Sequence, residues 1–427
     1  MTPVSSPSRE VAMRAPLLDL LPHEPDDPLL ALIREFRDDP RPNKVDLGVG
    51  VYRDDAGHTP ILKAVKLAER TLCDAQTTKS YIGLAGDLDF VRLLWEVVGG
   101  RAVDAGRVAG IQTVGASGAL RVAAELLRLA GAPQVLVGLP TWPNHAGIFA
   151  AAGLPVQTCA VFNAATQTAS TAETMDALGA APPGSAVLLH GCCHNPTGMD
   201  LSPDQWRDVA AIVTARGLIP LIDLAYQGLG QGIEEDVSGL RAMLALVPTA
   251  LVAVSASKSF GLYRERTGAL FAVASSPKAA AALQSQMQTL ARTSYSMPPD
   301  HGAAIVRTIL TDNTLRALWV DELGAMRSRI SGLRRALADA CSPVVPALRA
   351  VATQQGMFSL LPLKVEDVHH LKQDHGIYMP SSGRINIAGL QSSQVAMVAE
   401  ALTWPLRRDA EPISRCGPVN KARPRMV

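Results

Sequence analysis

The chain has 427 residues, of which 48% are hydrophobic and 19% charged, and its formal net charge is +1. This composition is typical of a soluble globular protein and excludes a disordered chain, while the length favours more than one domain. A net charge so close to zero gives no reason to expect nucleic acid or a membrane surface as a partner. Six cysteines are too few for a disulfide framework, and the first residues show no signal-peptide pattern, so we expect a cytoplasmic protein.

Short apolar runs alternate with helical patterns between about residues 110 and 275. Runs rich in valine, leucine and isoleucine are typical of strands that are buried on both faces. Their alternation with helices predicts a mainly parallel sheet covered by helices. The expected strands cover residues 134–139, 185–191, 218–223 and 249–257, and two of the expected helices cover residues 118–130 and 203–217.

The pattern changes near residue 312, where long helices begin. We expect a helix over residues 315–340, followed by a smaller α/β portion that ends in a helix over residues 392–406. The first 60 residues can pack on this last portion. The expected division is an N-terminal extension (1–25), the first part of a small domain (26–60), a large domain (61–325), the second part of the small domain (326–407) and a tail (408–427).

Polar side chains follow each of the expected strands. In an open parallel sheet, ligands bind beyond the carboxyl ends of the strands, so these side chains are expected to share one rim. Upstream of them, a Gly-Ala-Ser-Gly turn opens a helix whose free N–H groups and dipole suit an anion. In chain order the rim residues are Gly115, Ala116 and Ser117, then Trp142 and His145, then His194 and Asn195, then Asp223 and Tyr226, and finally Ser255, Ser257, Lys258 and Arg266.

This set matches the needs of pyridoxal phosphate. That cofactor requires a lysine for a Schiff base, a partner for its pyridine nitrogen, an anion site for its phosphate and a flat group against its ring. Lys258 supplies the amine, and Ser255, Ser257 and Arg266 supply phosphate ligands around it. Each residue alone is more often structural, as a lysine after a strand is usually a solvated strand end. Their joint occurrence on successive strand ends favours the cofactor.

Three other patterns suggest different chemistry and are weaker. The HGCCH segment at 190–194 resembles a metal cluster, but adjacent cysteines on a strand point to opposite faces, so no metal site is expected. SASK at 255–258 matches the S-x-x-K of penicillin-binding enzymes, yet the chain contains no K-T-G. GVG at 48–50 lacks the third glycine of a dinucleotide fingerprint.

Several segments resemble the aspartate and aromatic-amino-acid aminotransferases, which are class I enzymes of the fold-type-I pyridoxal-phosphate group. The resemblance covers about residues 26–406. It implies a large domain with a mainly parallel, seven-stranded sheet flanked by helices, and a smaller α/β domain formed by both termini. The segments that carry it are VDLGVGVYRDDAGHTPIL, SYIGLAG, PTWPNH, HGCCHNPTG, DLAYQG, SASKSFGLYRERTGAL, QQGMFS and SGRINIAG.

The resemblance implies a role for each rim residue. Lys258 would form the Schiff base and later shuttle a proton between the substrate and the cofactor. Asp223, with His145 behind it, would keep the pyridine nitrogen protonated. The other roles implied are hydrogen bonds to the ring's phenolic oxygen from Tyr226 and Asn195, ring stacking by Trp142, and phosphate binding by Gly115, Ala116, Ser117, Ser255 and Arg266, with Tyr81 from a neighbouring subunit.

Two arginines would hold the substrate in enzymes of this kind. Arg384 would bind the α-carboxylate with help from Gly50 and Asn195, a task suited to its planar guanidinium. Arg292, beside Ser296, would come from the other subunit and receive a side-chain carboxylate. The resemblance therefore implies a homodimer with shared active sites. Leu29 and Leu30 would belong to an apolar lid that closes over the site.

The chain departs from the family pattern at several positions. Ala116 replaces the usual glycine of the phosphate turn, which can alter cofactor affinity. Met297 and Ser117 stand where aspartate-preferring members usually carry asparagine and threonine, which favours acceptance of aromatic side chains. Leu224 and Leu229 replace phenylalanines that often flank the DxAYQG motif.

The expected activity is transfer of the amino group of an aromatic amino acid or aspartate to 2-oxoglutarate. One alternative keeps the cofactor but gives a lyase, decarboxylase or carbon–carbon bond reaction, since positioning alone decides the fate of the carbanion. Retention of both Arg292 and Arg384 favours transamination. A non-catalytic binding protein is the second alternative, but such a protein would not need Lys258.

Overall fold

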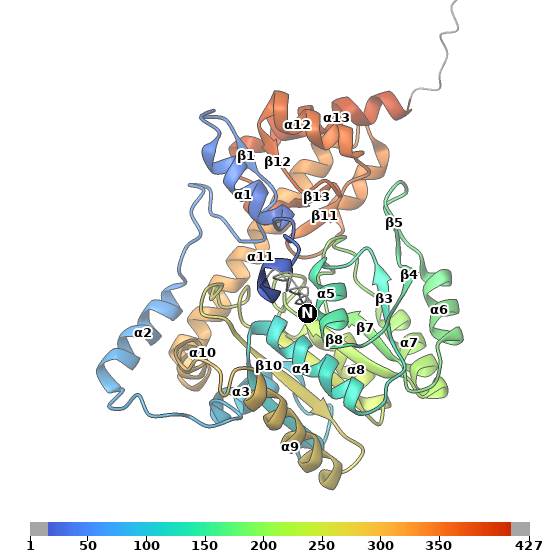
Figure 1. Ribbon diagram of the computed structural model, residues 1–427. Coiled ribbons are helices and arrows are strands. Elements are labelled where there is room, and N and C mark those ends of the chain that lie inside the picture. Colours follow the sequence, from blue (N-terminus) through green and yellow to red (C-terminus); the bar gives the residue numbers. More distant parts are fainter. Residues whose placement is uncertain (1–15, 411–427) are drawn as a thin grey trace, which may run out of the picture.

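A seven-stranded sheet forms the centre of the larger part of the molecule in the computed structural model, which describes residues 16–410 (Figure 1). Strand β10 is antiparallel to both of its neighbours, and the remaining pairs are parallel. The mainly parallel sheet is therefore confirmed. In spatial order its strands are β2 (Val108–Val114), β10 (Thr267–Val273), β9 (Ala250–Ser255), β8 (Ile219–Leu224), β7 (Ala186–His190), β3 (Val135–Leu139) and β4 (Val156–Ala160).

Both faces of this sheet are buried, which explains why its strands have continuous apolar runs. Along β8, Leu221 packs into one hydrophobic core and Ile222 into the other, because successive side chains of a strand point to opposite faces. On the side of Leu221 lie helices α4 (Gly115–Leu129), α5 (Asn144–Ala151) and α9 (Pro277–Ser294). The core of Ile222 includes helices α3 (Leu88–Val98), α6 (Thr171–Ala180), α7 (Pro203–Arg216), α8 (Ser238–Leu246) and α10 (His301–Thr311).

The smaller part of the molecule is built from both ends of the chain. Strand β1 (Val45–Asp46) pairs in parallel with β12 (Ile377–Tyr378), which confirms that the N-terminal segment packs on the last portion. A second small sheet joins β11 (Phe358–Leu360) to β13 (Arg384–Asn386) in antiparallel fashion. The remaining helices of the whole molecule are α1 (Pro28–Asp38), α2 (Lys63–Ala75), α11 (Asn313–Cys341), α12 (Val365–His375) and α13 (Val395–Ala410). The remaining strands, β5 (Phe162–Asn163) and β6 (Thr168–Ala169), form a hairpin.

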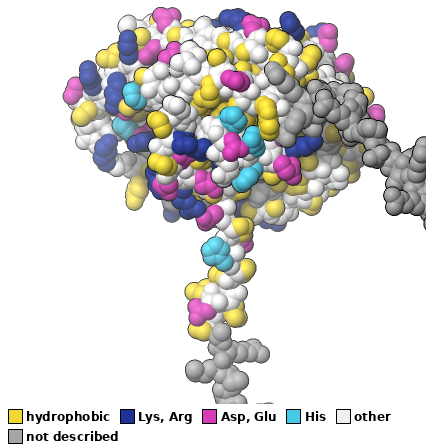
Figure 2. All heavy atoms as spheres, turned by 90° about the horizontal axis from the view of Figure 1, so that it is seen from above, with side chains coloured by type: hydrophobic (Ala, Val, Ile, Leu, Met, Phe, Trp, Pro, Cys, Tyr) yellow, Lys and Arg dark blue, Asp and Glu magenta, His cyan; other side chains and the backbone are white. Residues whose placement is uncertain are grey.

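The surface of this smaller part carries both signs of charge. Figure 2 shows lysine and arginine interspersed with aspartate and glutamate, with histidines near the middle of the view. On α12, the His370 ring lies 5.4 Å from that of His375 and 4.4 Å from that of Trp404 on α13, and His370 also pairs with Asp374. None of the helices within residues 16–410 is both long and apolar enough to cross a membrane.

The observed elements differ from the expected ones near the predicted boundaries. Helix α11 runs through residue 325, and α13 continues to Ala410 with Pro405 inside it, so residues 408–410 of the predicted tail are helical. Within the predicted extension, Leu17–Leu20 form a short 3₁₀ helix. Residues 1–15 and 411–427 lie outside the description, and the division into domains stays a prediction.

Trp319 of α11 ties the long helix to the turn that follows β9. Its ring stacks on Phe260 at 4.5 Å, and its Nε1 donates a hydrogen bond of 2.8 Å to the carbonyl of Ser259. We expect Trp319→Phe to lower the free energy of unfolding by about 1 kcal/mol, because the stack is kept while a buried carbonyl loses its partner. Denaturant unfolding measures this change. The exposed neighbour Val320, changed to alanine, is the control, and equal losses in both variants would contradict the prediction.

Candidate active site

The ends of three neighbouring strands bring Lys258, Tyr226 and Asn195 together. Lys258 lies in the turn after β9, Tyr226 after β8, and Asn195 in the turn after β7. The Lys258 Nζ is 5.4 Å from the centre of the Tyr226 ring, and the Asn195 Nδ2 donates to the Tyr226 hydroxyl at 3.3 Å. The expected rim at the carboxyl ends of the strands is thus observed.

Asp223 is the penultimate residue of β8 and is buried beside a histidine. Its Oδ2 lies 3.1 Å from the Nε2 of His145, whose Nδ1 is 2.8 Å from the Thr141 hydroxyl. Both residues are buried, and the contact with Thr141 fixes the orientation of the imidazole ring. The other carboxylate oxygen of Asp223, Oδ1, is buried without a hydrogen-bond partner. One side of this carboxylate is therefore held by protein, and the other side is ready to accept a hydrogen bond.

The amine of Lys258 is held in conditions that favour its neutral form. Loss of solvation on burial lowers the pKa of Lys258 to about 8, and the positive charges of Arg266 and Arg384 act in the same direction. Asp223 opposes these effects but does not cancel them. A neutral amine is the form that acts as a nucleophile or as a base, so a large fraction of Lys258 is competent near pH 8.

An anion-binding site lies next to this lysine, at the start of α4. The helix begins at Gly115 with no side chain capping its first turn, so the backbone N–H groups of the Gly115–Ser117 turn are available to a ligand. Gly115 has φ +63°, and an added Cβ would lie 2.7 Å from the Nη2 of Arg266. The Arg266 Nη1 also donates to the Ser257 hydroxyl at 3.4 Å, while the Ser257 N–H donates to the Ser255 hydroxyl at 3.1 Å.

Arg384 lies on β13 and reaches the same region from the smaller part of the molecule. Its Nη2 donates to the Gly48 carbonyl at 2.6 Å, and its guanidinium carbon lies 4.6 Å from the centre of the Phe358 ring. The Nε of Arg384 is buried without a partner. Burial lowers the pKa of Arg384 from its usual value, yet an arginine remains cationic at neutral pH.

Phe358 is a site residue to which the sequence analysis gave no role. Its ring also meets Tyr226 edge-on at 5.8 Å, and a Cβ on Gly50 would lie 3.0 Å from its Cζ. The QQGMFS segment carried part of the family resemblance, but its spacing alone does not reveal a contact with three distant segments. Phe358 therefore forms an apolar wall between Arg384 and Tyr226.

The remaining expected residues lie outside this cluster. Tyr81 is 91% exposed, and Leu30 on α1 is 59% exposed. Arg292 lies in the last turn of α9 and donates to the Ser296 hydroxyl at 2.6 Å. Within residues 16–410, no hydrogen bond, ion pair or ring contact connects Arg292 or Tyr81 to Lys258. Trp142 is partly buried and meets the His145 ring edge-on at 5.2 Å.

The geometric reason for rejecting a metal at HGCCH was wrong. Strand β7 ends at His190, so Cys192 and Cys193 lie in a turn, and their sulfurs and a carboxylate oxygen of Asp236 are within 4.8 Å of one another. A second group joins His145, His190 and Asp223. However, the Asp236 oxygens already accept four backbone N–H groups.

The protonation of the cysteines also disfavours a metal at the first group. The hydrogen bond with Cys192 and burial raise the pKa of the Cys193 thiol well above its usual value, so this thiol stays protonated. Neutral thiols are poor metal ligands, since the thiolate is the form that binds.

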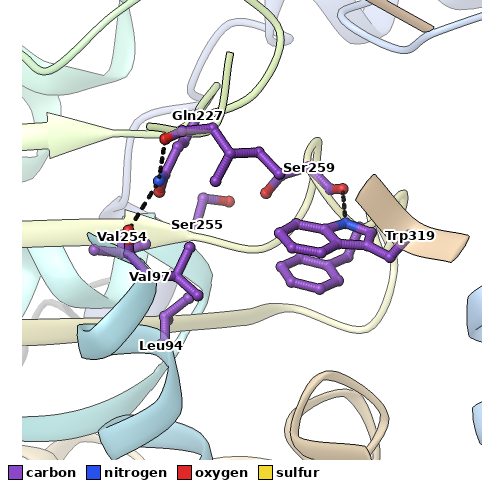
Figure 3. Close-up of a pocket in the computed structure, with 9 residues that line it drawn as sticks. Leu94, Val97, Gln227, Val254, Ser255, Ser259 and Trp319 are labelled. Carbon is purple, nitrogen blue, oxygen red and sulfur yellow. Dashed lines mark hydrogen bonds between the residues drawn. The ribbon is translucent and has the colours of Figure 1, made fainter. Parts of the chain in front are cut away.

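Figure 3 shows a small cavity beneath the lysine turn, between Ser255, Gln227 and Trp319. At the edge of this cavity, Gln227 Nε2 donates a hydrogen bond of 3.2 Å to the Val97 carbonyl. The cavity volume is about 10 Å³, enough for one water molecule but not for a cofactor. A larger cavity of about 90 Å³ is lined among others by Thr141, His190 and His194.

Three buried polar atoms without partners converge on the Lys258 region, namely Asp223 Oδ1, Asn195 Oδ1 and Arg384 Nε. Buried polar groups are normally paired, so these atoms indicate ligands that complete them. A protonated pyridine nitrogen fits Asp223, a phosphate fits the α4 terminus with Arg266, and a substrate carboxylate fits Arg384. A lysine amine, a buried carboxylate and an anion-binding helix at the strand ends of such a sheet define a pyridoxal-phosphate enzyme.

Comparisons with known proteins agree with this class. The model of the family "Aminotransferase class I and II" matches residues 42–402. The chain is 56% identical to a tyrosine aminotransferase of Rhizobium meliloti over 91% of this chain and 100% of that protein, and 41% identical to an aspartate aminotransferase of Escherichia coli over 88% and 97%. The chain thus belongs to the class I and II aminotransferases and is an aminotransferase.

A solved structure supports the cofactor as well. An aromatic-amino-acid aminotransferase from Burkholderia pseudomallei, covalently bound to pyridoxal phosphate, is similar to this chain with a TM-score of 0.88 and 38% sequence identity, over 91% of this chain and 99% of that chain. The family depends on pyridoxal phosphate, and the unpaired buried atoms and the anion site of this chain fit that group. The fold type I architecture is confirmed by the same likeness.

The lowered pKa of Lys258 predicts how the cofactor-free protein takes up pyridoxal phosphate. A pKa lowered to about 8 makes the neutral amine available above that pH, whereas an ordinary lysine needs a pH above about 10. The rate of cofactor incorporation, followed by absorbance, is expected to rise with pH through a midpoint near 8. Asp223→Asn should move the midpoint down, because Asp223 raises the pKa. A midpoint near 10 in the wild-type protein would refute this prediction.

Proposed function

We propose that this aminotransferase moves the amino group of an aromatic amino acid or of aspartate to 2-oxoglutarate in two half-reactions. The relatives named for tyrosine and for aspartate support this substrate class. The observation that carries the proposal is the buried Arg384 guanidinium, which has a free Nε beside the cluster of Lys258, Tyr226 and Asn195. A cation so placed suits the α-carboxylate that every amino donor shares. Among the named relatives, none favours a lyase or decarboxylase.

Bound pyridoxal phosphate supplies an electron sink that stabilises a carbanion at the substrate's Cα. Lys258 would hold this cofactor through its amine and, once free, would accept the proton that leaves Cα. Asp223 would hold a proton on the pyridine nitrogen, with His145 fixing the carboxylate. The proposed remaining contacts are Tyr226 and Asn195 to the phenolic oxygen, Trp142 to the ring face, and Gly115, Ala116, Ser117, Ser255, Ser257 and Arg266 to the phosphate.

The distal end of the substrate requires a second arginine. Arg292 is exposed, and Ser296 is the only hydrogen-bond partner of its side chain within residues 16–410. Its guanidinium is thus accessible, which supports a role in the site of a second copy of the chain. Tyr81, almost fully exposed, would reach the phosphate of the other subunit in the same way. We therefore propose a homodimer in which each active site uses residues of both chains. Gly50 would line the α-carboxylate site, and Leu29 and Leu30 would cover it.

Two further features belong to this proposal. Met297 and Ser117 replace polar groups expected behind the distal arginine of aspartate-preferring members, which favours aromatic donors. A cytoplasmic location is supported by the cysteines, since the five within the described residues are all free.

Replacing each arginine separately tests the substrate assignment. Arg384→Leu should lower kcat/KM about 100-fold for aspartate and phenylalanine alike, because both lose a charged hydrogen-bonding partner for the α-carboxylate. Arg292→Leu should lower kcat/KM for aspartate by a similar factor and that for phenylalanine much less. Steady-state kinetics at a fixed concentration of 2-oxoglutarate measures kcat/KM for both donors. The exposed Arg316, changed to leucine, is the control, and equal losses for both donors in Arg292→Leu would refute the distal assignment.

Mixing two inactive variants tests the shared site. A heterodimer of Lys258→Ala with Arg292→Leu would contain one fully wild-type site, since the intact Lys258 meets the intact Arg292 of its partner. Random pairing should restore about a quarter of the wild-type aspartate activity. The two proteins are mixed after dissociation and assayed after reassociation. No recovery, despite heterodimers identified by tag capture, would show that both residues act within one chain.

A further inference from the structure

Arg334, in the second half of α11 (the long helix labelled in Figure 1), has one of the largest side chains that are almost completely buried within residues 16–410. Its guanidinium donates to the carbonyls of Gly356 at 2.7 Å, Phe358 at 2.6 Å and Gln355 at 3.0 Å. It also donates to the Ser359 hydroxyl at 2.8 Å. These partners are neutral and belong to one short segment that enters β11. A buried arginine is costly unless its hydrogen bonds are satisfied, so its presence requires an explanation.

The segment that Arg334 holds lies between the two halves of the active site. On one side, the Gln355 N–H donates to the Gly198 carbonyl at 2.7 Å, in the turn that also carries Asn195. On the other side, β11 pairs with β13, where Leu360 is opposite Arg384. Gly356 has φ +71°, and an added Cβ would lie 2.3 Å from the Cβ of Cys193. The segment is thus held on both sides, and Arg334 additionally binds three of its carbonyls and one of its hydroxyls.

Phe358 connects the segment that Arg334 binds to Arg384 and Tyr226. Its carbonyl is bound by Arg334, while its ring lies 4.6 Å from the guanidinium carbon of Arg384 and 5.8 Å from the Tyr226 ring. A buried network reinforces the arrangement: the Ser359 hydroxyl donates to Gln354 Oε1 at 2.5 Å, and the Gln354 amide donates to Gln167 at 3.0 Å. A shift of the segment would therefore move the aromatic face on which Arg384 rests.

We propose that Arg334 is a positioning residue for substrate binding, which acts through the Phe358 ring to fix the orientation of the Arg384 guanidinium. This inference rests on the proposed role of Arg384 as the α-carboxylate ligand. Within residues 16–410, the hydrogen bonds of Arg334 go to residues of the 351–359 segment, so its influence on the site is indirect. Its planar fork binds several carbonyls at once, which the single ammonium of a lysine cannot do.

The expected consequence is a loss of substrate affinity with little change in the chemical step. Arg334→Lys should raise KM for aspartate and phenylalanine by the same factor, about tenfold, because the α-carboxylate common to both is held less well. The inhibition constant of 3-phenylpropionate, which lacks the amino group and does not react, should rise equally. Cofactor absorbance and kcat should change much less.

Phe358→Leu is the second variant, since it keeps the carbonyl contacts of Arg334 and removes only the ring. It should raise the same constants, and the double variant should be no worse than the poorer single one, because both changes act along one path. Leu337→Ala, at a buried position one turn further along α11, is the structural control. It should lower the melting temperature without changing KM.

The outcomes separate this inference from the proposed function. Unchanged KM in Arg334→Lys with a lowered melting temperature, or effects of Arg334→Lys and Phe358→Leu that multiply, would overturn the positioning role. If Arg334→Lys does not fold, an unchanged inhibition constant in Phe358→Leu would overturn it instead, because the ring is the proposed link. If Arg384→Leu itself leaves KM and the inhibition constant unchanged, the proposed function fails, whatever the behaviour of Arg334.

Discussion

A concentration of positive charge at the strand ends is the constraint on which the active site depends. The charges of Arg266 and Arg384 act on Lys258, and Asp223 is the carboxylate that opposes them there. Such an arrangement is stable only if the amine is neutral or if anions enter, since burying unpaired charge is costly. A phosphate and a substrate carboxylate are anions of the required kind. Burial lowers the pKa of the lysine, and the positive charges that add to this effect also create affinity for the ligands.

Much of the fold follows from residues that can be recognised in the sequence. Strands β3, β7, β8 and β9 have apolar side chains on both faces, so their runs stand out. Strand β2 was not recognised because Gln112 and Thr113 interrupt its apolar pattern. The error at Cys192 and Cys193 arose from treating them as residues of strand β7, which ends at His190. A strand end depends on backbone conformation, here φ +53° at Cys193, which residue types alone do not reveal.

The candidate site was predictable in so far as it follows the strand ends. Asp223, Asn195, Tyr226 and Lys258 meet because parallel strands deliver their carboxyl ends to one edge. No comparable rule predicts the positions of Phe358 and Arg334 from the sequence, because their roles depend on contacts between segments far apart in the chain. Arg292 and Tyr81 are different again, since their assignment comes from the family resemblance and concerns a second subunit.

Helix α11 carries two anchors, one beside the turn of Lys258 and one beside the segment that packs on Arg384. Trp319 binds the turn next to Lys258, and Arg334 binds the segment that carries Phe358. Fifteen residues of α-helix separate them, which corresponds to about 22 Å of rigid rise. The helix thus fixes the distance between the turn that carries Lys258 and the segment that carries Phe358. Inserting or deleting a single residue between Trp319 and Arg334 would rotate one of these side chains by about 100° away from its partners. Evolution can therefore change the length of the neighbouring loops far more freely than the length of the helix between these two residues.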